Sequence, residues 1–318
     1  MRISSLAFIL YCGLTIGCSS TDHGFPCEET LVQELMPLQG ITNPVKVEIK
    51  PPFLIFENWK RSDSLFHIYD LTSHELKSTF GVKGEGSDEF VSPSLFQGPL
   101  SDFLIGDFGK NQIFRFGIDN EGLPIFKAAE TFGYDNALYD AAFVNDSLYI
   151  ADPKYMLQPS LYLLALQDSL PRKIWTYRSS DIMDYSLDPD MGNVYANRIV
   201  FCYGYKKQID FMDTSFNLIK RVKFDFDTSD ASILATGNEK ISYAYSYLGK
   251  RYLYALFFGM SWNENRAKDS FGTILEVFDL DGNPVIRYYL KGKRPVYFAV
   301  DEETFTLYGT IEDGDPED

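Results

Sequence analysis

The 318-residue sequence contains only three histidines, at positions 23, 67 and 74, and four cysteines. A zinc site is usually built from several His or Cys side chains that converge on one point, and these three histidines are scattered along the chain. The sequence also lacks a G-x-S-x-G motif, so a Ser-His-Asp hydrolase is not indicated. We therefore expect no metal site and no histidine-based catalysis.

Clusters of lysine and arginine are also missing. The chain has 29 Lys and Arg residues against 45 Asp and Glu residues, and its formal net charge is −16. Proteins that bind nucleic acid neutralise phosphates with grouped basic side chains. We expect no nucleic-acid partner, and the dispersed acidity favours solubility over steering of a particular ligand.

A nucleotide-binding loop is the third absence. The stretch STFGVKGEGSDEFVSP, residues 78–93, groups three glycines with a lysine. It lacks the third glycine of a G-x-G-x-x-G motif, and no lysine follows its last glycine as in a Walker loop. Its acidic residues would repel a phosphate. The stretch is instead expected to be a connection between repeated units.

The N-terminus has the pattern of a signal peptide. Arg2 precedes an uncharged apolar run that ends in LTIGC, with the small residue Gly17 before Cys18. This pattern resembles the bacterial lipobox, in which the cysteine is lipidated and becomes the first residue after cleavage, although Thr15 stands where Leu is most common. We expect a signal peptide at residues 1–17, a lipid anchor on Cys18 and a lipidated tether over residues 18–44. An ordinary secretory signal cut elsewhere is the alternative.

Cleavage would remove Cys12 and leave Cys27 and Cys202 as the cysteines without an assigned role. An exported protein can oxidise such a pair. Because Cys27 lies in the N-terminal lead and Cys202 lies inside an apolar run, we expect two thiols, with a disulfide as the alternative.

No stretch of the chain has a sustained helical period. From residue 45 onward, short runs of β-branched and aromatic residues alternate with polar ones and are broken by Gly, Asn, Asp and Pro. Similar runs recur at a spacing of 48 residues, beginning at Leu65, Ile113, Leu161 and Ile209. A fifth run begins at Ile274, after about 17 extra residues that we place in a loop around residues 259–270.

Each repeat contains four short strand-like runs joined by turns. Four-stranded antiparallel units of 40–50 residues are typical of β-propeller blades. The C-terminal sequence VYFAVDEETFTLYGTI supplies two strands of a further unit. We predict an all-β fold, a six-bladed β-propeller of four-stranded antiparallel blades spanning residues 45–318. Residues 29–38, which contain five apolar side chains, are the candidate strand that closes the last blade.

Several motifs resemble one group of propellers. The pattern F-G-x-x-G-x-G-x-x-E-F at residues 80–90, YIAD ending at Asp152, VFDLDGNPV at residues 277–285 and a late AVDEETFTLYG are similar to TolB-like and NHL-like six-bladed propellers. Such proteins occur as lipoproteins of Gram-negative bacteria. The resemblance covers roughly residues 45–311 and implies an outer-membrane lipoprotein, facing either the periplasm or the surface. It implies no single activity, because a fold does not fix a function.

Acidic residues end the predicted second strands of the first three blades, at Glu57, Asp107 and Asp152. Calcium lactonases of propeller type use acids and amides at the mouth of the central tunnel, so these acids are the catalytic candidates, with calcium as the cofactor. The equivalent positions in later blades fall near Tyr203, Phe257 and Thr310, which leaves half of such a ring without acids. The alternative is that each acid accepts hydrogen bonds from turn amides.

Trp262 is the remaining candidate for ligand binding, because it lies in the polar insertion, where burial is least expected. We expect a lipid-anchored envelope protein that binds or scaffolds an unidentified protein, peptide or glycan without catalysis. A calcium-dependent hydrolase or lactonase and a glycan-binding surface protein are the alternatives.

Overall fold

The computed structural model describes most of the chain as strands and turns. The described residues are 6–10, 24–38, 40–41, 44–58, 64–99, 101–134, 138–153, 160–176, 193–195, 198–204, 206–225, 240–261, 263–264 and 273–311. Within them, no helix has the length and hydropathy needed to cross a bilayer.

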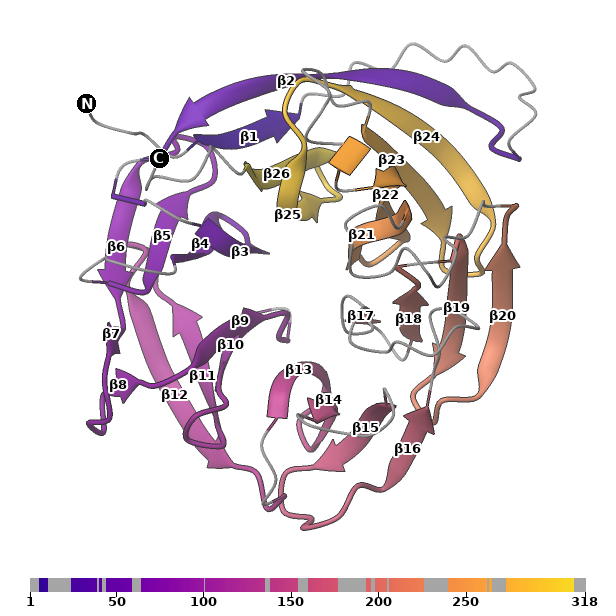
Figure 1. The fold of residues 1–318 in the computed structure, drawn as a ribbon. Helices are drawn as coiled ribbons and strands as arrows, with labels where there is room; N and C mark the ends of the chain where they lie inside the picture. The colour runs from indigo at the N-terminus through magenta and orange to yellow at the C-terminus, as the bar shows by residue number, and fades with distance from the viewer. Residues whose placement is uncertain are drawn as a thin grey trace.

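Five sheets of four or more strands surround a common centre in the described part of the chain, with their innermost strands facing it (Figure 1). The structure is therefore an antiparallel β-propeller. Four of the sheets have four strands each, in the order in which the chain forms them from the centre outward. They are β3 (Pro44–Lys50), β4 (Phe53–Asn58), β5 (Phe66–Asp70) and β6 (Leu76–Phe80); β9 (Pro93–Phe96), β10 (Phe103–Asp107), β11 (Gln112–Ile118) and β12 (Pro124–Thr131); β13 (Leu138–Asn145), β14 (Leu148–Pro153), β15 (Ser160–Ala165) and β16 (Lys173–Thr176); and β17 (Asn193–Tyr195), β18 (Arg198–Cys202), β19 (Gln208–Asp213) and β20 (Leu218–Lys223).

The fifth sheet has eight strands. Its order is β21 (Lys240–Leu248), β22 (Tyr252–Ser261), β23 (Thr273–Asp279), β24 (Pro284–Lys291), β2 (Glu28–Pro37), β1 (Leu6–Leu10), β26 (Thr306–Ile311) and β25 (Pro295–Asp301). The prediction of six separate four-stranded blades is wrong in this respect. The long strand β2 pairs in parallel with β24, and β1 lies between β2 and β26, so the two N-terminal strands together join the last two predicted blades into one sheet.

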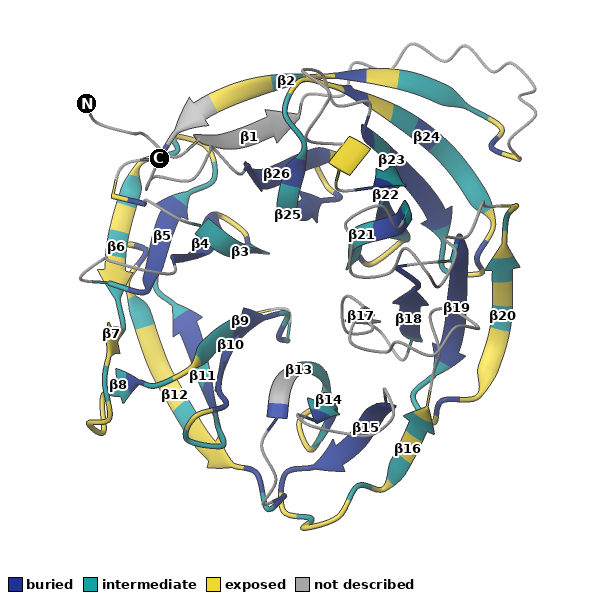
Figure 2. Ribbon diagram, in the orientation of Figure 1, coloured by how far each residue is buried: buried dark blue, intermediate teal, exposed yellow. Residues whose placement is uncertain are grey.

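The 48-residue spacing locates the third strands correctly. The five runs that begin at Leu65, Ile113, Leu161, Ile209 and Ile274 coincide with β5, β11, β15, β19 and β23 to within one residue of the strand start. Second and third strands are buried almost throughout, whereas the fourth strands of the four-stranded sheets have only half-buried and exposed positions (Figure 2). This gradient is expected when inner strands pack on both faces and the fourth strand forms the outer edge.

The glycine-rich stretch is the connection between the first two sheets. Val82–Lys83 (β7) and Glu89–Phe90 (β8) form a small parallel pair between β6 and β9. Gly81 has φ of +78°, a backbone conformation that glycine adopts without strain. Phe90 is buried and stacks edge-on against the rings of Phe66 and Phe114, so it fixes the connection to both sheets.

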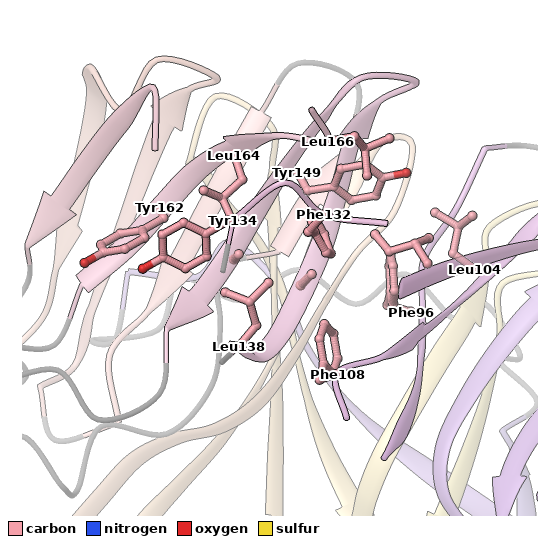
Figure 3. Packing of buried hydrophobic residues seen from close by; sticks show 13 residues of the cluster. Phe96, Leu104, Phe108, Phe132, Tyr134, Leu138, Tyr149, Tyr162, Leu164 and Leu166 are labelled. Carbon is pink, nitrogen blue, oxygen red and sulfur yellow. The ribbon is translucent and has the colours of Figure 1, made fainter. Parts of the chain in front are cut away.

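The buried hydrophobic side chains of the described residues form six clusters, each between successive units of the ring. Figure 3 shows the cluster between the second and third sheets, where Phe96 and Leu104 face Tyr149 and Leu164. One cluster lies within the eight-stranded sheet, between the side chains of β22–β24 and those of β25 and β26. Packing therefore separates the two halves of that sheet, although backbone pairing connects them.

The N-terminal residues 25–37, here called the closing segment, are docked on the eight-stranded sheet. The segment includes most of the predicted closing strand, residues 29–38. Phe25 is 1% exposed and contacts Phe278, and the Arg287 guanidinium carbon lies 4.6 Å from the centre of its ring. The backbone N–H of Arg287 donates to the carbonyl of Cys27 at 3.0 Å.

A buried charge network extends from the closing segment into the sheets. Arg287 donates to Glu28 at 3.1 Å and to Glu276 at 2.8 Å. Glu276, which is fully buried, also accepts hydrogen bonds from Lys207 at 2.9 Å and from the Tyr243 hydroxyl at 2.9 Å. Two cations and a hydroxyl thus offset the desolvation of this carboxylate.

Cys27 and Cys202 are both thiols in the structure, as predicted.

Candidate functional site

The acids predicted to line the tunnel mouth lie at the ends of their second strands. Glu57 is in β4 and Asp107 ends β10, both in buried positions, and Asp152 is half-buried in β14. Glu57 Oε2 accepts a hydrogen bond of 2.7 Å from the backbone N–H of Leu95 in the next sheet. This carboxylate therefore joins neighbouring sheets.

Asp107 holds the turns around its own strand. Its two carboxylate oxygens accept hydrogen bonds from the backbone N–H groups of Val91 at 2.8 Å, Ser92 at 2.9 Å and Gly109 at 3.1 Å. Within the described residues, no three His, Cys, Asp or Glu side chains gather as they would to hold a metal ion. Glu57, Asp107 and Asp152 are thus not brought together as a metal-binding group.

The other predicted positions cannot be placed. Trp262 and the lipidation candidate Cys18 lie outside the described residues.

His67 lies in β5 and is 3% exposed. Burial lowers its pKa below the ordinary 6.5, against the opposing effect of a backbone hydrogen bond with Gly40, and its Nδ1 has no hydrogen-bond partner in the structure. This histidine is a core residue of the first sheet.

A cavity of about 110 Å³ lies at the opposite end of the ring. It is formed where the innermost strands turn back into the second strands, whereas Glu57 and Asp107 lie where second strands end. Four parts of the ring contribute: β3, the β9–β10 connection, the β21–β22 turn and the β25–β26 turn. The lining residues are Glu48, Ile49, Lys50, Pro51, Gln97, Gly98, Tyr247, Gly249, Lys250, Val300, Asp301, Glu302 and Glu303.

The cavity lies near the centre of the ring, because its lining residues come from opposite sides. The Gln97 side chain donates a hydrogen bond of 3.3 Å to the carbonyl of Leu248, which connects the second sheet to the eight-stranded sheet across the ring. A ligand bound in this cavity would contact sheets that are far apart in the sequence. Its binding would therefore require that these sheets be assembled into the closed ring.

Glu48 and Lys50 are a buried pair of opposite charges in the cavity wall. Both side chains belong to β3, and their charged atoms are 3.9 Å apart. Lys50 also donates to the carbonyls of Gly98 at 3.3 Å and Pro99 at 3.1 Å. Burial raises the pKa of Glu48 and lowers the pKa of Lys50, in each case against the attraction of the other charge. Buried acids with a displaced pKa in a cavity are typical of functional sites.

The acids of the β25–β26 turn are used structurally. Glu302 accepts hydrogen bonds from the backbone N–H groups of Arg251 at 2.9 Å and Tyr252 at 3.1 Å. Asp301 accepts from the backbone N–H of Glu303 at 3.0 Å and from the Thr304 hydroxyl at 2.7 Å. The described contact of the Glu48 carboxylate is the longer one of 3.9 Å to Lys50. Of the buried acids in the cavity wall, we therefore regard Glu48 as the one most able to accept a hydrogen bond from a ligand.

Sequence reasoning missed Glu48 and Lys50. The signal was present in VKVEIKP, residues 45–51, where charged residues alternate with apolar ones along an innermost strand. Such alternation ordinarily marks a solvated face. Only the ring, which turns both faces of an inner strand toward protein or cavity, identifies these charges as buried.

Neither a family model nor a curated protein matches the sequence. Solved structures resemble it in fold. A member of the DUF4221 family from Bacteroides vulgatus is 13% identical, with a TM-score of 0.51 over 85% of this chain and 92% of that one. A Bacteroides fragilis protein provisionally designated as exported is 12% identical, with a TM-score of 0.49 over 95% and 83% of the two chains.

A Bacteroides fragilis protein provisionally designated a 6-phosphogluconolactonase is 15% identical, with a TM-score of 0.46 over 96% of this chain and 87% of that one. The chain spans 63% of the length of the Kluyveromyces lactis Hsv2 structure that it also matches. At these identities the likeness concerns the propeller fold alone.

The first prediction concerns Asp107. Replacing it in Asp107→Ala should lower the free energy of unfolding by about 2–4 kcal/mol, because three partly buried hydrogen bonds from backbone amides lose their charged acceptor. Chemical denaturation measures the change. Asp146→Ala is the matched control, since the Asp146 side chain is 83% exposed and its ion pair with Arg115 contributes little. An Asp107→Ala protein as stable as the control would show that this acid is not structural and would restore it as a catalytic candidate.

The second prediction concerns His67 and pH. Because its pKa is lower in the folded protein than in the unfolded chain, the unfolded chain binds more protons near pH 6. The free energy of unfolding should therefore fall as the pH is lowered through 6.5 and below. His67→Gln should reduce this loss in urea titrations at pH 5.5 and 7.5, conditions that bracket the ordinary pKa of about 6.5. Equal losses in both proteins would contradict the assignment of His67 as a buried, neutral side chain.

Proposed function

We propose that this protein is a lipid-anchored, exported β-propeller that works by binding, and that the cavity around Glu48 and Lys50 is its ligand site. The observation that supports this most is the location of that pair. Two opposite charges are buried at the centre of the ring beside a cavity of about 110 Å³. Burying two charges costs free energy, and apolar residues of the same size would fill this space without that cost. A role of the pair in ligand recognition would explain why the charges are there.

The chemistry of the cavity favours a ligand that donates hydrogen bonds. Four acids and two lysines line it, and Lys50 already donates to two carbonyls. A carboxylate offers only acceptors. Glu48 would thus bind an ammonium, hydroxyl or amide N–H group, and a cavity of this volume would admit a group of a few non-hydrogen atoms rather than a whole oligosaccharide.

The N-terminal pattern that ends at Cys18 supports a location at the envelope, because it resembles a lipoprotein signal. We further propose that the eight-stranded sheet is two blades, which makes a six-bladed, TolB-like or NHL-like propeller. The separate core clusters on the two sides of the β25–β26 pair, one against β22–β24 and one against the first sheet, support this count.

The lipid anchor would hold the ring close to the membrane. Phe25 is buried in the propeller, so seven residues, 18–24, separate Cys18 from the ring along the chain. An extended chain rises by at most about 3.6 Å per residue, which limits the tether to roughly 25 Å. The anchored side of the ring would be the eight-stranded sheet, to which the closing segment is docked.

The calcium-dependent lactonase loses its main support, because Glu57 and Asp107 each accept hydrogen bonds from backbone amides. Trp262, on which the glycan-binding alternative rests, lies outside the described residues.

The third prediction tests the ligand site. Small amines, polyols and primary amides would be screened by thermal unfolding against wild type, Glu48→Gln and Glu303→Gln. Glu303 is an exposed acid at the same cavity and serves as the matched control. At least one compound should raise the melting temperature of wild type and Glu303→Gln but not of Glu48→Gln, because a bound ligand stabilises only the folded state. A stabilising compound that acts equally on Glu48→Gln would refute the assigned site.

A further inference from the structure

The last part of the ring contains a strand from the extreme N-terminus. β1 (Leu6–Leu10) lies between β2 and β26 and is antiparallel to both (Figure 1). Its residues 7–10 are paired with residues 307–310 of β26, and its residues 6–10 are paired with residues 33–37 of β2. β1 therefore provides the only described connection by backbone pairing between β26 and the closing segment.

This strand lies within the segment that the sequence assigns to a signal peptide, residues 1–17. Cleavage before Cys18 would remove all of β1 from the mature protein. The strand would therefore belong to the precursor, and its place in the sheet would become empty once the protein is exported.

Both neighbours of β1 are held independently of it. β26 is paired with β25, and Leu307 and Tyr308 are buried in the core. β2 is paired with β24 over residues 28–32 and is anchored by Phe25 and the Glu28–Arg287 ion pair. Loss of β1 would leave two facing strand edges about 9–10 Å apart, twice the ordinary spacing of paired strands. We call this gap the acceptor slot, lined by residues 33–37 and 307–310.

The acceptor slot exposes unpaired N–H and C=O groups on both sides. An open strand edge readily pairs with another extended segment, and this one would offer two edges at once. A segment that enters between them would satisfy the backbone groups of both β26 and β2. The need to pair these backbone groups does not depend on the cavity around Glu48.

We propose that in the mature protein the acceptor slot receives an extended, apolar strand from a different protein, antiparallel to β26. The sequence of β1, LAFIL, indicates the chemistry that fits: about five uncharged apolar residues without proline. Paired main-chain groups would supply most of the affinity, and the side chains would supply specificity.

Neither terminal segment of the mature chain has a sequence suited to this slot. Residues 18–24 are polar, and they precede the buried Phe25, which lies near the N-terminal end of β2. A hairpin formed by these residues would pair with the first half of β2. It would not reach residues 33–37, which line the slot. Residues 312–318 are EDGDPED, acidic and interrupted by proline. A second copy would bring the same two tails, and its other described strands are already within sheets.

The fourth prediction tests this proposal with a soluble form of the mature protein, residues 19–318, which omits the lipidated Cys18. The probe is a fluorescent peptide containing SLAFILY, flanked by lysines for solubility. Fluorescence anisotropy should show saturable binding, and the peptide should raise the melting temperature. The control is the same peptide with N-methyl groups on alternate residues, which keeps the side chains but removes the donors to one edge. We expect its affinity to fall at least about tenfold, since each lost hydrogen bond contributes about 1 kcal/mol.

Three outcomes decide the matter. Mature protein that folds only when the peptide is present would support the slot as strongly as direct binding. Failure to bind the peptide by a stably folded mature protein would overturn the proposal, as would equal binding of the N-methylated peptide. A stable mature dimer that excludes the peptide would also overturn it, in favour of a second copy as the occupant.

Discussion

Closure of the ring depends on a buried carboxylate. Glu276 is fully buried and neutralised by Arg287 and Lys207, and the same Arg287 binds Glu28 and lies against the Phe25 ring in the closing segment. Removing one partner from such a buried pair typically costs about 3–5 kcal/mol. The N-terminal segment thus completes a charge network rather than merely covering an apolar edge, and the parallel pairing of β2 with β24 follows from where that network holds it.

The two ends of the ring use their charges differently. At the end where second strands finish, Glu57 and Asp107 accept hydrogen bonds from backbone amides and fix the connections between sheets. At the other end, Glu48 and Lys50 are buried beside a cavity, and the charge of Glu48 is balanced only at 3.9 Å. A scaffold that is rigid at one end and retains uncommitted buried charge at the other is suited to holding a small ligand, which is why the cavity end is the proposed site.

The repeat of 48 residues was enough to predict the propeller and its third strands, because period-two alternation and turn residues are local properties of the sequence. The number of separate sheets was not predictable in this way, since β2 joins β24 through contacts about 260 residues apart in the chain, such as Arg287 with Glu28. The surroundings of the candidate acids were not predictable for the same reason. Glu57 and Asp107 looked like ligands at strand ends, but their partners Leu95, Val91 and Ser92 become neighbours only in the folded ring. Glu48 and Lys50 looked like a solvated face until the ring enclosed them.

The central claim is that the closing segment is part of the cooperative fold, and native-state hydrogen exchange of the mature protein tests it most directly. The amides of residues 28–32, which pair with β24, would be compared with those of the buried strands β4 and β22 across increasing denaturant. The account predicts that all three sets open with the same free energy, that of global unfolding. Exchange of residues 28–32 at a free energy several kcal/mol lower, independent of denaturant, would show that the segment is a detachable tether and that the ring closes without it.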